Sequence, residues 1–493
     1  MDSDEVTWAP SDNPSYRAFF KAARRGTVEQ LRAAFTDDID VNALEGDGFE
    51  GMSALHLACF YNGDLEVVKF LLDHGAEVNI LDRDRAGNSY PLHWAANKDR
   101  ADIVKLLLDR GAERDRKGFD GRNALGMVLY YSLSPRPVEE KQMETIKVLL
   151  DYGFSVDESG MLFEAVLSRD QYLIKFLLDH GGSINPANPK DPSLLGHAAG
   201  FTDYKTVKFL LDNGAVLDNP TDGSPSSVLV SAASTGNPSV VQLLLDSADP
   251  EIVRKSNRAI SSAAASGHLK VVEMLLASNM SLDNDNAIGY QSPLHAACFT
   301  NQPSPELVTF LLSQGADVNS LDDRLNTPFD AFCANRPRTV HLHVSTYQPD
   351  EKVVRLLLDA GADLGARNTN GETPLLRAAS ALHCHYQQGN PHDSRGSAFV
   401  VLLRRLLKAG SDIKAIDHLN QTALHILASN SPVCTPGECP ERAAQVLLDL
   451  GVEVEALDVK GRTAIDILQE KHTIESRLIL HTIENFKLRQ TSK

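Results

Sequence analysis

The sequence has 493 residues and a formal net charge of −18, with 42% apolar and 6% aromatic residues. This acidity argues against direct nucleic-acid binding, which needs clustered Lys and Arg. No run of about 18 apolar residues occurs, and the acidic start MDSDEVTWAP lacks the basic and apolar regions of a signal peptide. Six scattered cysteines are too few for a disulfide framework in so long a chain. We therefore expect an intracellular monomer, cytoplasmic and/or nuclear, without membrane insertion.

The first predicted elements are an acidic tail over residues 1–14 and a helical end unit that starts at Ser15. The segment SYRAFFKAARRGTVEQLRAAF carries charge on one face, as the terminal unit of a repeat array must when it meets solvent. We interpret it as an amino-terminal cap.

The first complete unit begins at Gly51 with GMSALHLACFYNGDLEVVKFLLDHGAEVN. Apolar residues at helical spacing predict a first helix after Ser53, which is a suitable cap. A second helix follows the break at Asn62 and Gly63. It should end at Gly75, where a left-handed conformation is needed and glycine bears no Cβ penalty. The polar stretch that leads into the next unit is called a finger below.

The phrase LLDHGAEVN recurs along almost the whole chain. From Gly75 to Gly315 its mean spacing, with two degenerate copies at Ser247 and Asn279, is about 33 residues, the length of an ankyrin unit. The glycines that mark it are Gly75, Gly111, Gly153, Gly181, Gly214, Gly315, Gly361, Gly410 and Gly451.

Another motif lies in the first predicted helix of each unit and is called the first motif below. It recurs in phase with the phrase above, which is called the second motif. The first motif reads SALH at Ser53, YPLH at Tyr90, SPLH at Ser292 and TALH at Thr422, with partial copies TPFD at Thr327, TPLL at Thr373 and TAID at Thr463. The chain resembles ankyrin-repeat proteins, whose signature is T-P-L-H. The resemblance implies an all-α solenoid of helix-turn-helix units joined by β-hairpin-like fingers. About 12–13 units span residues 15–472.

Three central units, within about residues 193–285, lack the first motif but keep the second. Because a repeat array is stabilised by contacts between neighbouring units, weak units should weaken the coupling. We predict that unfolding is not two-state and that the break lies between Leu217 and Asp285. Denaturant titration followed by probes at both ends tests this. One sharp transition, identical at both probes, would contradict it.

Four units are longer than the rest because the turn between their two helices is enlarged, at residues 132–140, 335–350, 383–397 and 430–440. The last three belong to consecutive units, so their turns should form one ridge. The ridge holds His341, His343, His383, Cys384, His385, His392, Cys434 and Cys439. A zinc site needs about four converging ligands. The loose spacing of Cys434 and Cys439 favours solvated loop residues, so we assign no metal ligand.

After the array, residues 473–493 predict a terminal helix and tail. Ile474, Leu478, Ile483 and Phe486 fall roughly on one stripe. We expect this helix to seal the last groove, and docking of a partner is the alternative.

The remaining motifs favour structural roles. Gly46, Gly48 and Gly51 spell GxGxxG, but no apolar strand precedes them, so they are interpreted as turn glycines. His56, His93, His295 and His425 recur at the fourth position of the first motif. The resemblance implies that they tie the finger to the helices by hydrogen bonds. It also implies that Asn79, Asn185 and Asn319 stabilise turns. No catalytic residue, cofactor site or metal site is predicted.

The leading hypothesis is a non-enzymatic scaffold or adaptor that binds a protein on its concave face. That face is expected to consist of finger tips and first helices, and the overall charge favours a basic partner. A regulatory variant would sequester a transcription factor or signalling protein. The alternative is a catalytic or metal-dependent activity on the carboxyl-terminal ridge. Aromatic anchors dominate binding energy in interfaces, and the candidates are Phe60, Tyr61, Trp94, Phe201 and Phe299.

Overall fold

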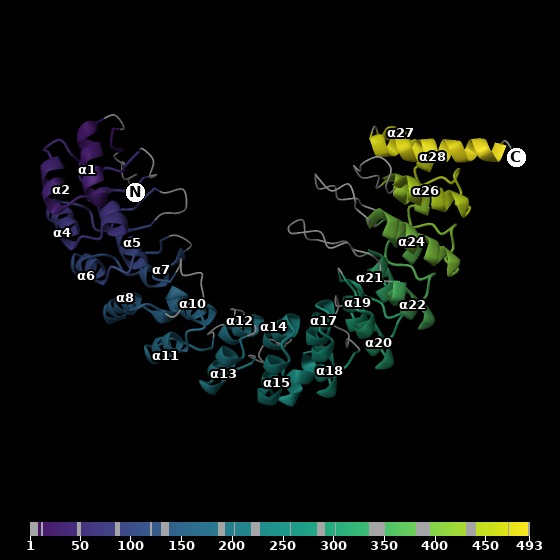
Figure 1. Ribbon diagram of the computed structural model, residues 1–493, viewed down its shortest axis with the longest axis horizontal. Coiled ribbons are helices and arrows are strands. Elements are labelled where there is room, and N and C mark those ends of the chain that lie inside the picture. Colours follow the sequence, from purple (N-terminus) through teal and green to yellow (C-terminus); the bar gives the residue numbers. More distant parts are fainter. Residues whose placement is uncertain are drawn as a thin grey trace. The chain divides into compact units, whose positions relative to one another are not determined.

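The structure is a computed structural model (Figure 1). It describes residues 8–10, 13–46, 51–83, 89–118, 121–129, 138–185, 193–201, 203–217, 227–256, 258–282, 291–300, 302–334, 351–380, 395–429, 440–471 and 473–491. The chain divides into two compact units, Met1–Asn219 and Pro220–Lys493, called the amino-terminal and carboxyl-terminal units below. The boundary falls within the region where the sequence predicts weak coupling.

The amino-terminal unit is built from pairs of short helices. Its helices are α1 (Pro14–Arg25), α2 (Val28–Ala34), α3 (Ala54–Leu57), the π-helical turn η1 (Ala58–Asn62), α4 (Leu65–Asp73), α5 (Pro91–Asn97), α6 (Ala101–Asp109), α7 (Ala124–Met127), α8 (Glu140–Asp151), α9 (Val156–Ser159), α10 (Met161–Leu167), α11 (Gln171–Asp179), α12 (Leu194–Gly200) and α13 (Tyr204–Asp212). First helices stack on first helices, as in α5 on α7, and second helices stack on second helices, as in α4 on α6.

The carboxyl-terminal unit repeats the arrangement. Its helices are α14 (Ser227–Thr235), α15 (Pro238–Ser247), α16 (Pro250–Lys255), α17 (Arg258–Ala265), α18 (Leu269–Ala277), α19 (Pro293–Cys298), α20 (Pro305–Ser313), α21 (Pro328–Ala334), α22 (Glu351–Asp359), α23 (Pro374–Ser380), α24 (Arg395–Lys408), α25 (Ala423–Ser429), α26 (Pro440–Asp449), α27 (Ala464–Glu470) and α28 (Ile474–Thr491). A continuous stack of first helices runs through α14, α17, α19, α21, α23, α25 and α27.

The elements within a single repeat follow the sequence prediction. Ser53 caps α3, because its hydroxyl accepts a hydrogen bond from the backbone N–H of His56 at 3.4 Å. Gly75 adopts the predicted left-handed conformation, with φ of 93°. The core consists of the facing apolar residues of the two helices, and Leu55, Leu57 and Leu71 are fully buried. The all-helical fold is therefore confirmed.

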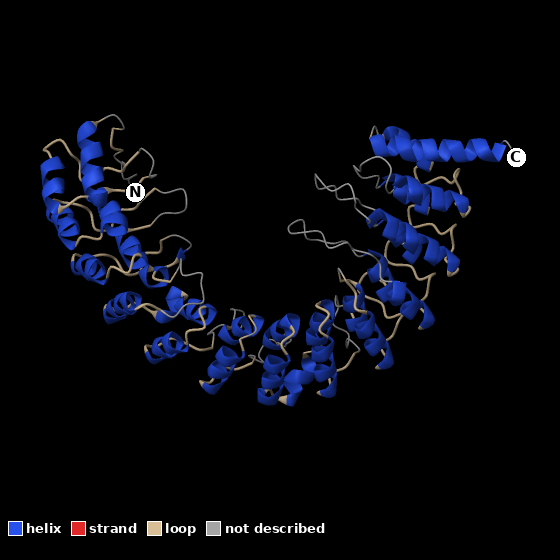
Figure 2. Ribbon diagram, viewed as in Figure 1, coloured by secondary structure: helices blue, strands red, loops and turns tan. Residues whose placement is uncertain are grey.

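The fingers differ from the prediction in part. No strand occurs in the residues that the structure describes, which are helices, turns and loops (Figure 2), so the hairpin character of the fingers stays a prediction. Two fingers contain short helices instead, α9 and α16. In α16, Pro250 at the start of the helix and the Asp249 side chain, which accepts from Glu251 N–H at 2.8 Å, explain the extra turn.

Most residues of the four predicted enlarged turns lie outside the described part of the chain, as do all eight His and Cys residues of the predicted ridge. Three of the predicted turns extend too far at their carboxyl ends, into the helices that follow them. Helices α8, α24 and α26 already begin at Glu140, Arg395 and Pro440, because these residues can start a helix before the apolar periodicity becomes visible.

The last helix packs against α26 and α27. Ile479 and Ile483 are fully buried in this contact, whereas Leu478 and Phe486 are half-buried. The apolar stripe is thus centred on Ile479 and Ile483. This placement covers the end of the carboxyl-terminal unit, which is the arrangement expected of a cap.

Candidate partner-binding surface

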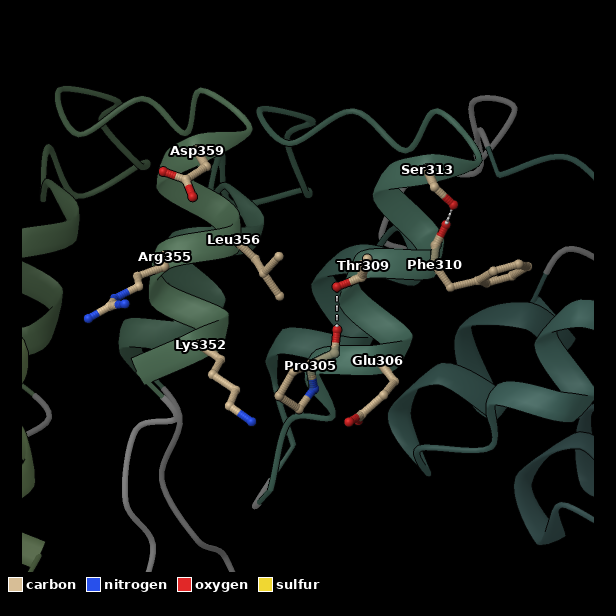
Figure 3. Close-up of a pocket in the computed structure, with 9 residues that line it drawn as sticks. All are labelled: Pro305, Glu306, Thr309, Phe310, Ser313, Lys352, Arg355, Leu356 and Asp359. Carbon is tan, nitrogen blue, oxygen red and sulfur yellow. Dashed lines mark hydrogen bonds between the residues drawn. The ribbon is translucent and has the colours of Figure 1, made fainter.

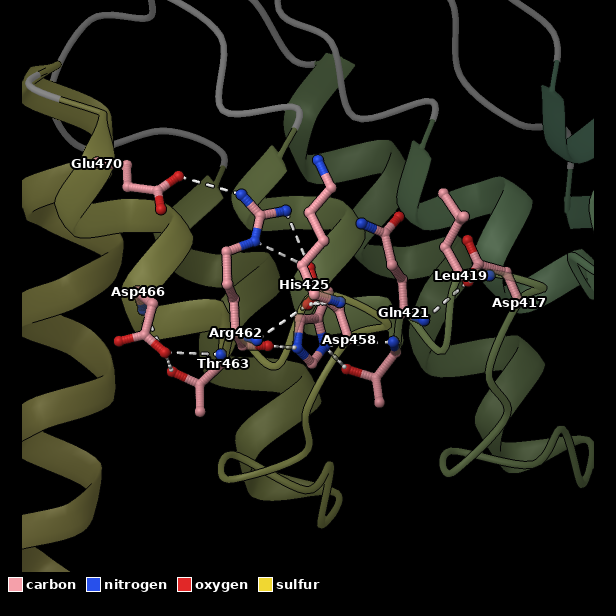
Figure 4. Close-up of polar contacts among 11 residues, drawn as sticks. Asp417, Leu419, Gln421, His425, Asp458, Arg462, Thr463, Asp466 and Glu470 are labelled. Atoms are coloured by element: carbon pink, nitrogen blue, oxygen red, sulfur yellow. Dashed lines mark hydrogen bonds and ion pairs between the residues drawn. The ribbon is translucent and has the colours of Figure 1, made fainter.

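The last four fingers of the carboxyl-terminal unit form the same tight turn. In the last finger, the Asp458 backbone N–H donates to the Arg462 carbonyl at 2.9 Å. The Asp458 carboxylate also accepts from the backbone N–H groups of Lys460 at 2.8 Å and Arg462 at 2.9 Å (Figure 4). Asp322, Asn368 and Asp417 make equivalent bonds in the preceding fingers. A side-chain oxygen therefore fixes each turn from inside.

Consecutive fingers are joined by backbone hydrogen bonds at their tips. The N–H of Thr369 donates to the Arg324 carbonyl at 2.9 Å, and the N–H of His418 donates to the Asn370 carbonyl at 2.9 Å. The N–H of Val459 completes the series by donating to the Leu419 carbonyl at 3.0 Å. The donor and the acceptor hold the same two positions in every finger. The four tips, residues 321–325, 367–371, 416–420 and 457–461, thus form one row in register, called the finger-tip row below.

The finger-tip row exposes aliphatic side chains. Six of them are between 39% and 57% exposed: Leu321, Leu325, Ile416, Leu419, Leu457 and Val459. Leu321, Ile416 and Leu457 directly precede the residue that fixes each turn. These residues are not among the predicted anchors, because the fingers are polar overall and aromatic residues are the expected anchors. The sequence does contain a pattern that marks them, since an aliphatic residue recurs directly before Asp322, Asp417 and Asp458.

The histidines of the first motif connect each finger to a helix, as predicted. His295 Nε2 lies 2.8 Å from the Asn326 carbonyl oxygen, and His295 Nδ1 lies 2.7 Å from the Ser292 hydroxyl. In His56, Nδ1 accepts from the backbone N–H of Ser53 at 3.2 Å while Nε2 faces the Ser89 carbonyl at 3.2 Å. A carbonyl can only accept, so Nε2 carries the proton and the ring is neutral.

Burial keeps these rings uncharged. It lowers the pKa of His56 from 6.5 to about 3 and that of His93 to about 4. The pKa of His295 is lowered for the same reason. These rings are poor general bases for catalysis at neutral pH, since each already has both nitrogens engaged in the fold.

The side chains of the finger asparagines bond to the following repeat, and their role in stabilising a turn stays a prediction. The Asn79 amide donates to the Gly111 carbonyl at 3.1 Å and accepts from the Glu113 N–H at 2.9 Å. Asn185 and Asn319 make the same pair of bonds to the following repeat. One amide therefore joins two consecutive repeats. This role cannot be predicted from the sequence, because it depends on where the second repeat lies in space.

The five aromatic candidates lie in different environments. Trp94 is only 7% exposed, so it cannot be the exposed anchor that the prediction requires. Its indole N–H donates to the Asp82 carboxylate at 2.7 Å, and its ring packs edge-on against Phe60 with centroids 4.8 Å apart. Phe60 and Tyr61 are half-buried, and Lys98 Nζ lies 4.2 Å from the Phe60 ring centroid. Trp94 therefore serves to link a finger to α5.

Phe201 and Phe299 are exposed, at 49% and 41%. Each follows a first helix directly, at the ends of α12 and α19. They belong to different units, and their role in partner binding stays a prediction.

One residue of the first motif departs from the repeat. Asp330 stands where the signature has His, and it is fully buried. One carboxylate oxygen accepts from the Thr327 N–H at 2.9 Å and the Thr327 hydroxyl at 2.8 Å, while the other has no hydrogen-bond partner among the described residues. Burial raises the pKa of Asp330 from 3.8 to about 6.

Replacing Asp330 by Asn is expected to stabilise the carboxyl-terminal unit at pH 7.5. The folded state holds the Asp330 proton more tightly than the unfolded state, so stability falls as pH rises from 3.8 to about 6 and then stays low. The shift in the pKa of Asp330 corresponds to about 3 kcal/mol at most. We expect Asp330→Asn to raise the free energy of unfolding by about 1 to 2 kcal/mol. Urea denaturation across this pH range measures it.

Asp466 provides a matched control for that variant. It holds the same motif position and makes the same bonds to the Thr463 N–H and hydroxyl, at 2.8 and 2.7 Å, but it is exposed (Figure 4). The Thr463 hydrogen bonds lower its pKa, so Asp466→Asn should destabilise. A loss of stability in both variants would mean that burial does not determine how the Asp330 carboxylate affects stability.

A groove lies between the second helices α20 and α22 (Figure 3). Its volume is about 690 Å³, and its apolar lining includes Phe310 and Leu356. Oppositely charged residues flank it, with Glu306 and Asp359 against Lys352 and Arg355. This balance of charge gives no preference for a ligand of either sign.

The cysteines in the described part of the chain lie in the core. Cys59, Cys298 and Cys333 are fully buried. Burial raises the pKa of the Cys298 thiol to about 12, so it is not a thiolate nucleophile at neutral pH. Within the described ranges, no group of three or more His, Cys, Asp or Glu side chains could hold a metal ion. Nor is any helix in those ranges both long and apolar enough to cross a membrane.

Comparison with known proteins gives the family. The family model for ankyrin repeats in three copies matches residues 19–118, 195–286 and 229–322, and the model for ankyrin repeats in many copies matches residues 340–387. Together these matches cover more than half of the chain.

Three relatives illustrate the similarity. Human protein phosphatase 1 regulatory subunit 27 is 35% identical over 109 residues, which are 22% of this chain and 66% of that protein. The E3 ubiquitin-protein ligase hecd-1 of Caenorhabditis elegans is 35% identical over 111 residues, which are 22% of this chain and 4% of hecd-1. The E3 ubiquitin-protein ligase KEG of Arabidopsis thaliana is 27% identical over 310 residues, which are 58% of this chain and 18% of KEG.

The chain thus spans less than two thirds of the length of each of these relatives. The two recurring motifs, the stacked helix pairs and the family matches agree, and the chain belongs to the ankyrin-repeat family.

Proposed function

We propose that this protein is a non-enzymatic scaffold that binds a partner protein through its finger tips and first helices, the face expected to be concave. Ankyrin repeats indicate a protein–protein interaction domain. The observation that carries the proposal is the finger-tip row, where six exposed aliphatic side chains are held in register by backbone hydrogen bonds. Aliphatic side chains on a rigid support lose little entropy on binding and release water when covered.

The proposed role is regulatory in the sense that binding alone changes what the partner can do. One relative is named as a regulatory subunit of a protein phosphatase, which supports a role of this kind. The buried motif histidines and cysteines support the non-enzymatic part of the proposal, since they are engaged in the fold. We place the protein in the cytoplasm and/or nucleus.

Affinity capture from an extract of the source cells tests the proposal. The baits are the intact protein, a Leu419→Asp/Leu457→Asp variant and a Val216→Asp control, which changes an equally exposed aliphatic residue outside the finger-tip row. We expect at least one protein that binds the intact bait and the control, and binds the finger-tip variant at least 10-fold less. Purified components must then reproduce the complex.

Absence of any protein that binds the intact bait in the purified system would overturn the proposal. A partner that is retained equally by all three baits would move the binding site away from the finger-tip row. Circular dichroism of the three baits shows whether the exposed substitutions leave the fold intact.

A further inference from the structure

One hydrogen bond of the first motif ties a repeat to the finger that follows it, and it is called the finger link below. In each case Nε2 of the motif histidine lies near the backbone carbonyl oxygen of the residue directly before the next copy of the motif. The pairs are His56 and Ser89 at 3.2 Å, His295 and Asn326 at 2.8 Å, and His425 and Arg462 at 3.1 Å. The finger link therefore needs a side chain at the fourth motif position that can donate a hydrogen bond.

Two consecutive repeats of the carboxyl-terminal unit have another residue in place of this histidine. The fourth motif position is Asp330 in the repeat that begins at Thr327 and Leu376 in the repeat that begins at Thr373. A leucine side chain has no donor at any pH, whereas a carboxyl group donates when it is protonated and only accepts when it is ionised. Asp330 is thus the residue whose finger link can depend on pH.

Asp330 is held in the same way as the histidine that it replaces. Its Oδ2 lies 2.8 Å from the Thr327 hydroxyl, just as Nδ1 of His295 lies 2.7 Å from the Ser292 hydroxyl. The other oxygen, Oδ1, therefore corresponds to Nε2 of the histidine. Oδ1 is buried and has no hydrogen-bond partner among the described residues.

The acceptor of this finger link is the Glu372 carbonyl, because Glu372 directly precedes the next copy of the motif. Within the described part of the chain, this carbonyl accepts from the Asn368 N–H at 3.1 Å. The equivalent carbonyl of Asn326 accepts from the Asp322 N–H at 3.0 Å and has the His295 ring as a second partner. The Glu372 carbonyl can accept a second bond in the same way, since it has two lone pairs.

Burial and the surrounding charges determine when Asp330 holds a proton. Burial is the largest cause and raises its pKa from 3.8 to about 6, and the Asp322 carboxylate in the preceding finger acts in the same direction. The Arg377 guanidinium, on the neighbouring helix α23, opposes them. On α19, burial lowers the pKa of His295, so this ring is neutral. On α21 itself, burial raises the pKa of the Cys333 thiol, which is therefore neutral too.

We propose that Asp330 is a proton-controlled finger link between the repeat that begins at Thr327 and the finger of residues 366–372. The ionised carboxylate leaves this link open. The protonated carboxyl group, which takes its proton from solvent when the finger opens, donates to the Glu372 carbonyl as the histidine does elsewhere. Because a carboxyl group is shorter than an imidazole, this bond draws the finger toward α21. The tip of this finger belongs to the finger-tip row, so acid stabilises part of the proposed partner-binding surface.

Hydrogen–deuterium exchange of the full chain tests this at the finger itself. The N–H groups of Asn368 and Gly371 are bonded within the finger, and that of Thr369 is bonded to the finger before it, so they exchange when the finger opens. Their protection, corrected for the intrinsic pH dependence of exchange, should rise about 4-fold from pH 7.5 to 5.5, because the pKa is about 6 in the closed finger and 3.8 in the open one. The finger that follows Leu376, residues 415–421, is the internal control and should not change.

Two variants separate the hydrogen bond from the removal of a buried charge. Asp330→Asn carries a permanent donor, so residues 368–371 should be as protected at pH 7.5 as in the parent at pH 5.5, with no pH dependence. Asp330→Leu copies Leu376, which the fold accepts at the same motif position, and has neither a charge nor a donor. It should protect these residues at least about 3-fold less than Asp330→Asn at both pH values. Asp466→Asn should leave the response of this finger unchanged.

Three outcomes would overturn the inference. The first is protection of residues 368–371 that does not change with pH in the parent, and the second is an equal pH dependence in Asp330→Asn. The third is equal protection in Asp330→Asn and Asp330→Leu, which would mean that loss of the buried charge, and not a bond to the finger, produces the effect. These measurements involve no partner, so any of these results would leave the proposed function standing.

Discussion

Acidification from pH 7.5 to 5 is expected to remove about 4 kcal/mol of the stability that two buried histidines give to the amino-terminal unit. The cause is the neutral pair His56 and His93, whose folded pKa values are about 3 and about 4 against 6.5 when exposed. Their contribution is fully present above pH 6.5 and is lost as pH falls below it, by about 1.4 kcal/mol per pH unit for each ring. At pH 5 this amounts to about 2 kcal/mol for each ring, a large part of the stability of a small domain.

Geometry explains why protonation is so costly. In His56, Nδ1 accepts the Ser53 backbone N–H, and in His93, Nδ1 accepts the Tyr90 backbone N–H at 3.4 Å. A proton on Nδ1 would replace each accepted bond by a contact between two donors. The charged ring would also be buried, since both side chains are at most 1% exposed.

Urea denaturation followed by tryptophan fluorescence measures this effect. The sequence contains only Trp8 and Trp94, and both lie in the amino-terminal unit, so their signal reports on that unit. The control is His56→Gln/His93→Gln, which should be less stable than the parent at pH 7.5 but lose less stability by pH 5. A pH dependence as steep as the parent's would show that other groups control the acid response.

The architecture was predictable because it depends on periodic features. The recurrence of glycine after LLD marks where a left-handed residue ends each second helix, and Gly75 shows that conformation. The histidine role was also predictable, because a residue that recurs at one position of a repeat must meet the same neighbours each time. Local caps such as Ser53 need only three residues of sequence and were visible for that reason.

Features that depend on the third dimension were not predictable. The amide of Asn79 bonds to a carbonyl 32 residues later, which only the stacking of units places within reach. Trp94 occupies a helix position that faces Asp82 of the preceding finger, and periodicity alone does not distinguish that position from an exposed one. Leu419 is exposed because the turn around Asp417 points it outward, although its residue type favours burial.

Trp94→Ala is expected to destabilise the amino-terminal unit by about 3 to 5 kcal/mol, the usual cost of truncating a buried Trp. The variant loses the packing of the indole against Phe60 and leaves a cavity between α5 and the finger that contains Asp82. It also removes the donor that bonds to the fully buried Asp82 carboxylate at 2.7 Å. Urea denaturation followed by circular dichroism measures the loss of stability. The first unfolding transition should move to a lower urea concentration.

Trp94→Phe separates the two contributions. Phe keeps most of the ring contact with Phe60 but cannot donate to Asp82, so it should cost about 1 to 3 kcal/mol, less than Ala. A stability change below about 1 kcal/mol in Trp94→Ala would contradict the buried placement and restore Trp94 as a surface anchor. If the predicted order is found, weaker partner capture by Trp94→Ala reflects unfolding of its own unit. Phe299→Ala then becomes the informative variant, because the Phe299 side chain is exposed.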